Sequence, residues 1–190
     1  MADSALPATY AIITHEDDQF SPIAFFPEAQ ELATVYDFEN KPYAQIVRIP
    51  AHVTRVIQPQ FSSDAQIGES ARVLGYDFAR NLDSIDLRIY WQCISPMRDD
   101  YTVFVHLIDS NQSSIVSQDD AQPGHGNYPT SRWRQRETII DNYHLKINSA
   151  SENFQIALGM YSLQNGERLP VLVNGQRVRD DALILNLFTK

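Results

Sequence analysis

The residues best suited to chemistry lie together in one polar stretch, residues 119–134. This stretch combines carboxylates, amides, two prolines, two glycines and two large aromatic side chains. A connection of this length without regular structure is typically either functional or packed down by its own side chains. Its candidate ligand-binding residues are Asp120, Tyr128, Arg132 and Trp133.

Each candidate has its own binding capacity. The Asp120 carboxylate can accept hydrogen bonds from sugar hydroxyls or ligate Ca²⁺, although the oxygens of this stretch lack the alternating spacing of common calcium loops. Tyr128 and Trp133 can offer flat faces to a sugar ring, and Arg132 can bind a carboxylate or phosphate with two parallel hydrogen bonds. The structural alternative is simpler: Trp133 plugs the open end of a sandwich and Arg132 pairs with an Asp.

Other chemistries find less support in the sequence. One cysteine and five scattered histidines give no metal-ligand spacing, so no zinc site and no cofactor are expected. There is no Gly-x-Ser-x-Gly nucleophile elbow and no glycine-rich phosphate loop, so no catalytic residue is assigned. Glycoside hydrolysis stays open as an alternative, because Asp120, Glu137 and Asp141 can meet in space.

The net charge and the hydropathy of the chain limit the kinds of partner that it can bind. The 190 residues include 15 basic and 24 acidic side chains, giving a net charge of −9. Such a chain is a poor match for nucleic acid or anionic lipid, which need clustered Lys and Arg. No run approaches the roughly 20 apolar residues that span a bilayer, so the chain is not expected to insert into a membrane. Its first residues lack the features of a signal peptide.

The chain from residue 71 onward has the pattern of a β-sandwich. In the strongest strand Leu87, Ile89, Trp91 and Cys93 share one face, so Trp91 and an inert Cys93 thiol are expected in the core. Asn-Gly turns at 165–166 and 174–175 separate later strands. We expect an antiparallel sandwich, immunoglobulin-like or jelly-roll, with strands over 72–78, 85–94, 101–109, 115–118, 137–147, 154–163, 168–173 and 182–189.

The N-terminal part is expected to be a small α/β segment over residues 1–52. Apolar runs predict strands over 8–14, 31–38 and 43–49. Ser21 and Pro22 predict the start of a short helix through about residue 26. Residues 53–70 show little periodicity and are expected to connect this segment to the sandwich domain, residues 71–190.

Several blocks of the sequence resemble an extracytoplasmic module of bacterial membrane proteins. The similar family is the C-terminal β-sandwich of Chloroflexi-type multi-pass glycosyltransferases, which are dolichyl-phosphate-mannose mannosyltransferase-like. Residues 9–50 resemble the short α/β segment that often precedes this module. The sandwich blocks are Leu74-Gly75-Tyr76-Asp77, the strand 87–92, the strand 101–107, Pro129-Thr130-Ser131-Arg132-Trp133, Leu158-Gly159-Met160-Tyr161 and the segment 166–171.

The resemblance implies a noncatalytic accessory domain outside the cytoplasm. In that family the catalytic acidic residue lies in the membrane part, so none is carried over to this chain. The implied partners are a glycan, or the acceptor that the module positions, and the membrane part of a larger protein. A protein-interaction or assembly module without glycan affinity is the first alternative, a small polysaccharide hydrolase is the second, and a cytoplasmic location stays open.

Overall fold

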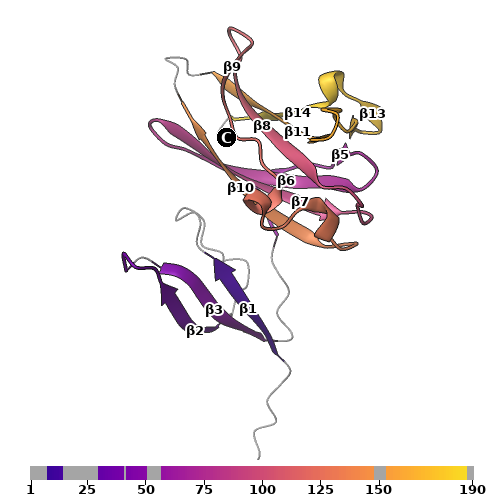
Figure 1. Cartoon of the computed structure of the whole chain (residues 1–190). Coiled ribbons are helices and arrows are strands. Elements are labelled where there is room, and N and C mark those ends of the chain that lie inside the picture. The colour runs from indigo at the N-terminus through magenta and orange to yellow at the C-terminus, as the bar shows by residue number, and fades with distance from the viewer. Residues whose placement is uncertain (1–7, 15–29, 41, 51–56, 148–152, 188–190) are drawn as a thin grey trace, which may run out of the picture. The chain divides into compact units, whose positions relative to one another are not determined.

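The computed structural model describes residues 8–14, 30–40, 42–50, 57–147 and 153–187. The chain divides into two compact units, Met1–Gln58 and Pro59–Lys190 (Figure 1). The helix expected over residues 21–26 lies outside the described residues. Within the described part, helical structure is limited to short 3₁₀ turns, and no helix there is long and apolar enough to cross a membrane.

The N-terminal unit is a three-stranded antiparallel sheet. Its strands are β1 (Ala8–Thr14), β2 (Gln30–Tyr36) and β3 (Pro42–Pro50), arranged β1-β3-β2 with β3 in the centre. The three strands expected from the apolar runs are thus confirmed. Between β2 and β3 the chain turns at Asn40, which has a φ of 61° and whose N–H donates to the Asp37 carbonyl. Asn tolerates this left-handed conformation better than most residues.

The second unit is an antiparallel β-sandwich, as the strand pattern predicts (Figure 1). Its smaller sheet has the order β14 (Leu183–Asn186), β11 (Phe154–Ser162), β8 (Tyr101–Asp109) and β9 (Ser114–Gln118). Its larger sheet begins at the edge strand β10 (Thr138–Lys146). After β10 come β7 (Ser84–Cys93), β6 (Ala71–Arg80), β5 (Gln66–Ile67), β12 (Val171–Val173) and β13 (Gln176–Arg177), and β4 (Phe61–Ser62) pairs with β6.

The core lies between the two sheets and follows the alternation of the sequence. The inward side chains of β7, including Leu87, Ile89 and Trp91, are fully buried against Val105 of β8 and Ile156 of β11. Burying one such aliphatic side chain contributes about 1.5–3 kcal/mol. Trp91 and Cys93 are core residues, as expected from their strand.

Part of the stretch 53–70, which was expected to connect the two parts, contributes two short strands to the sandwich. β4 places Phe61 opposite Tyr76, and β5 places Ile67 opposite Ala71. A Cβ at Gly75 would lie 2.4 Å from the Phe61 carbonyl oxygen, so the absence of a side chain there lets β4 approach. Strands of two residues are too short to show a period, which is why the sequence did not reveal them.

The C-terminal strands are shorter than the sequence pattern suggests. Residues 168–173 were expected to form one strand, yet only Val171–Val173 do, after Pro170, which has no N–H to donate to a sheet. Asn174 and Gly175, with φ values of 51° and 74°, form the tight turn between β12 and β13 that Asn-Gly predicts.

Candidate functional site

The long stretch 119–134 is packed down by its own backbone and side chains. It contains two 3₁₀ turns, η2 (Pro123–Gly126) and η3 (Thr130–Arg132). Gly124, His125 and Gly126 follow one another in the left-handed region, with φ values of 62°, 47° and 88°. Two of the three are glycines, which adopt this conformation without strain.

Trp133 belongs to the core, so its ring offers no face to a sugar. The side chain is 2% exposed, and its ring centroid lies 6.1 Å from that of Trp91. Its indole N–H donates to the Tyr128 carbonyl at 3.1 Å. The side chain is packed as the structural alternative from the sequence describes, and the ligand-binding role of Trp133 stays a prediction that its burial disfavours.

Tyr128 and Arg132 lie near each other, but the Tyr128 hydroxyl already has hydrogen-bond partners whereas the Arg132 side chain is exposed. The Tyr128 hydroxyl donates to the Glu137 carboxylate at 2.9 Å, and burial together with this carboxylate raises the pKa of Tyr128. Its ring packs against the core. The Arg132 side chain is exposed. The ion pair expected between Arg132 and an Asp is not formed with any carboxylate in the described part of the chain.

Asp120 is engaged elsewhere, on the smaller sheet. Its carboxylate lies 3.1 Å from Nε2 of His106, and it also accepts a long hydrogen bond from the Val105 N–H at 3.4 Å. Among the described residues, no group of three or more His, Cys, Asp or Glu side chains is placed to hold a metal ion. The structure thus gives Asp120 partners that Tyr128 and Arg132 do not share.

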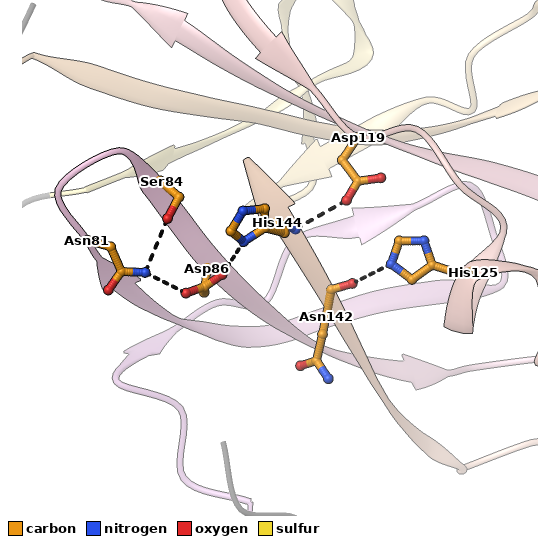
Figure 2. A network of polar contacts seen from close by, with 7 residues as sticks. All are labelled: Asn81, Ser84, Asp86, Asp119, His125, Asn142 and His144. Atoms are coloured by element: carbon orange, nitrogen blue, oxygen red, sulfur yellow. Dashed lines mark hydrogen bonds and ion pairs between the residues drawn. The ribbon is translucent and has the colours of Figure 1, made fainter. Parts of the chain in front are cut away.

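Asp119 and His125 cap the free edge of β10 (Figure 2). The Asp119 carboxylate accepts a hydrogen bond from the backbone N–H of His144 at 3.2 Å. The ring Nε2 of His125 donates to the backbone carbonyl of Asn142, also at 3.2 Å. An open sheet edge is a template for unwanted strand pairing. These two side chains therefore give the long stretch a structural role along this edge.

The remaining contacts of this network join β10 to β7 and brace the turn before β7. His144 and Asp86 are directly opposite each other, with Nδ1 and Oδ1 2.6 Å apart. The Asn81 side-chain amide donates to Asp86 at 2.8 Å and to Ser84 at 3.3 Å. Figure 2 shows these partners around the start of β7. The arrangement is that of a cross-strand pair that stabilises the sheet.

Asp141 points inward from β10 and is 2% exposed. Its carboxylate accepts hydrogen bonds from the Gly124 N–H at 2.9 Å and from the Tyr143 hydroxyl at 2.5 Å. Burial raises its pKa to about 6 despite these two donors. The neighbouring Trp91 indole N–H makes no hydrogen bond of good geometry within the described structure. A carboxylate sealed in this way cannot reach a polysaccharide, so the trio of Asp120, Glu137 and Asp141 forms no open hydrolytic cleft.

An open depression of about 420 Å³ lies elsewhere on the sandwich. Three chain segments far apart in the sequence line it: residues 68–70, residues 96–101 and residues 169–170. Its apolar lining comes from Pro96, Met97, Leu169, Pro170 and the part-buried ring of Tyr101. Its polar lining comes from Glu69, Ser70, Arg98 and Asp99. The volume lies within the range of small-molecule pockets, while the lining is more polar and more open than is usual for them.

The walls of the depression are fastened to one another by hydrogen bonds. The Gly68 N–H donates to the Pro170 carbonyl at 2.8 Å, and the hydroxyls of Ser70 and Ser95 lie 2.9 Å apart. The buried Thr130 hydroxyl donates to the Asp99 carbonyl at 2.8 Å and accepts from the Tyr101 N–H at 2.9 Å. The long stretch that looked like a site in the sequence therefore supports the wall of this depression from behind.

The charged side chains that line this depression make no polar contacts within the described structure. Glu69, Arg98 and Asp99 are exposed, and in the described structure their side chains form no hydrogen bond and no ion pair. By contrast, Asp120, Tyr128 and Asp141 already have partners. Sequence reasoning missed the depression because its three segments become neighbours only in the folded chain. The one feature of the sequence near these residues that could have pointed to it is a proline in two of the three segments, Pro96 and Pro170.

The comparisons with known proteins give little beyond the fold. No protein-family model matches the chain, and no curated protein matches it. Among solved structures, the crystal structure of the C-terminal domain of Wzt is similar, with a TM-score of 0.47 and 10% sequence identity. The likeness covers 70% of this chain and 83% of that chain. A fold by itself does not assign a function.

Proposed function

We propose that this chain is a noncatalytic accessory module that binds carbohydrate in the depression between residues 68–70, 96–101 and 169–170. The observation that carries the proposal is the set of three unused charged side chains on a rigid, partly apolar hollow. The walls of the hollow are already held by hydrogen bonds and need little ordering when a ligand binds, whereas the exposed side chains of Glu69, Arg98 and Asp99 must be ordered at about 0.5–1.5 kcal/mol each.

The lining suits the chemistry of a sugar. A sugar ring has apolar C–H faces, which can pack on Tyr101, Met97 and Leu169. It also carries hydroxyls, which can donate to the carboxylates of Glu69 and Asp99 and accept from the guanidinium of Arg98. The hollow is open, so it fits the end of a glycan chain better than a fully enclosed small molecule.

Exposure of both carboxylates favours binding over hydrolysis. A glycosidase needs one carboxyl group kept protonated, usually by an apolar environment, beside a second that is ionised. Glu69 and Asp99 are both exposed to solvent. The buried Asp141 has the raised pKa but faces the core. We therefore assign the chain a binding role and expect no release of reducing ends from the glycan that it binds.

The larger protein in our proposal is a bacterial membrane glycosyltransferase, with this chain on its extracytoplasmic side. The support is the resemblance of several sequence blocks to the sandwich module of that family. Protease treatment of intact cells that carry the native gene, with an antibody to this chain, tests the location. Digestion by external protease is expected. Protection in intact cells with digestion after lysis would point to the cytoplasmic alternative.

A glycan-array screen of the full chain, run with matched variants, tests the binding function. Arg98→Ala should reduce binding of the array hit at least about tenfold, the effect of losing a charge-assisted hydrogen bond. Arg132→Ala is the control, since this arginine is also exposed and lies outside the lining. Loss of binding in the Arg132 variant alone would return the site to the long stretch.

A chain that binds no glycan would instead favour the assembly role. In that case sedimentation of the purified chain should show self-association, or a partner should be retained by it. Wild-type binding that both variants keep would place the ligand outside the depression and outside the long stretch.

A further inference from the structure

The charges on the depression specify which sugars it accepts. The geometry points to a site for glycan ends without a negative charge, which discriminates against acidic sugars such as uronic acids. This inference rests on the proposed carbohydrate-binding function and adds the chemical class of the ligand.

The lining carries two carboxylates and one guanidinium. Glu69 and Asp99 are the acidic groups and Arg98 is the basic one. The next residue, Asp100, lies outside the lining, and one of its oxygens accepts a hydrogen bond from the Ser131 N–H at 3.1 Å. The whole chain has a net charge of −9. A bound anion would therefore meet one favourable charge and at least two unfavourable ones.

A neutral sugar can use all of these groups at once. Carboxylates only accept hydrogen bonds and a guanidinium only donates them, while each sugar hydroxyl can do both. Hydroxyls therefore satisfy Glu69, Asp99 and Arg98 together without adding charge. An acidic sugar satisfies Arg98 but leaves a carboxylate facing a carboxylate. At separations of about 5 Å in a water-like medium, one net repulsion of this kind weakens binding roughly fourfold at low salt.

Two surface substitutions should reverse this preference. The double variant Glu69→Gln, Asp99→Asn keeps acceptor oxygens of similar size and leaves Arg98 as the sole charge of the lining. The matched control is Asp64→Asn, Asp83→Asn, which changes the net charge by the same amount at exposed residues outside the lining. Urea midpoints of the three proteins check that all are equally folded.

The experiment is isothermal titration of the full chain with three probes at low and high salt. The probes are a neutral hexose tetrasaccharide from the array, the tetrasaccharide of the corresponding uronic acid, and an amino-sugar tetrasaccharide. We expect the neutral probe to bind wild type about fourfold more tightly than the acidic probe at low salt, with the gap narrowing at high salt. In the lining variant the acidic probe should bind at least as well as the neutral one, while the control keeps the wild-type order.

The outcomes distinguish a failure of the charge selectivity from a failure of the proposed carbohydrate-binding function. If none of the three probes binds, the proposed carbohydrate-binding function fails. If the acidic probe binds wild type as tightly as the neutral probe, the function stands and the charge selectivity is wrong. The same holds if the lining variant keeps the wild-type order. The amino-sugar probe is a cation, so the same net charge should let it bind at least as tightly as the neutral probe at low salt. Weaker binding of the amino-sugar probe than of the neutral one would overturn the charge argument.

Discussion

The buried carboxylate of Asp141 accepts a hydrogen bond from the backbone N–H of Gly124, 17 residues earlier in the chain, at 2.9 Å. This contact fixes the left-handed run at Gly124, His125 and Gly126 against β10. From there the His125 ring reaches the backbone carbonyl of Asn142 at the sheet edge. The buried Asp141 thus has a structural role, because it holds the turn at residues 124–126 against β10.

Replacing Asp141 by Ala should destabilise the sandwich. The Gly124 N–H and the Tyr143 hydroxyl would lose their shared acceptor in a buried place, at a cost of about 1–3 kcal/mol for each unsatisfied group. Urea unfolding measures the change, and limited proteolysis should show faster cleavage within residues 123–134. Asp83→Ala, an exposed aspartate, is the control and should leave both readouts unchanged. Wild-type behaviour of the Asp141 variant would refute the anchoring role.

The stability of the wild type should depend on pH through Asp141. Its pKa is raised from 3.8 to about 6 in the folded protein, so between these values the folded state binds more protons than the unfolded state. Stability therefore falls as pH rises through this window. A shift of about 2 units corresponds to roughly 3 kcal/mol.

The test is the difference in unfolding free energy between wild type and Asp141→Asn, measured from pH 4 to pH 7. The Asn side chain does not titrate, so the wild type should lose stability relative to the variant as pH rises. Groups shared by the two proteins cancel in this difference. A difference that stays flat, or that moves in favour of the wild type as pH rises, would contradict the raised pKa.

Trp133 should be a stability residue and not a binding residue. Trp133→Ala would leave a large cavity next to Trp91, at a cost of about 3–5 kcal/mol. Trp133→Phe should cost less, since it keeps most of the packing and loses only the hydrogen bond to the Tyr128 carbonyl. Thermal unfolding measures both. If Trp133→Phe keeps its fold but loses glycan binding, Trp133 has a direct role in the site after all.

Thr130→Val should weaken ligand binding from behind the depression. Valine has nearly the same shape, but it cannot hold the Asp99 carbonyl and the Tyr101 N–H as the threonine hydroxyl does. We expect a loss of about 1–2 kcal/mol of stability and a drop of several-fold in affinity for the array hit. Thr138→Val, on β10, is the control for a threonine outside this wall. Unchanged affinity in the Thr130 variant would show that the wall does not depend on this hydroxyl.

The sequence by itself determined the sandwich. Alternating apolar residues over β6, β7, β8, β10 and β11 set which side chains face the core, because successive side chains of a strand point to opposite faces. The Asn174-Gly175 turn followed equally from local conformational preference. These features depend on neighbours within a few residues, and a sequence shows such neighbours directly.

Only the tertiary structure decided where a ligand can bind. In the sequence, residues 119–134 looked like the site because their polar groups are concentrated there. Folding gives Asp120, Tyr128 and Asp141 partners on other strands and leaves Glu69, Arg98 and Asp99 without any in the described structure. Whether a polar side chain is used or free depends on residues distant in the chain, and a sequence does not record those distances.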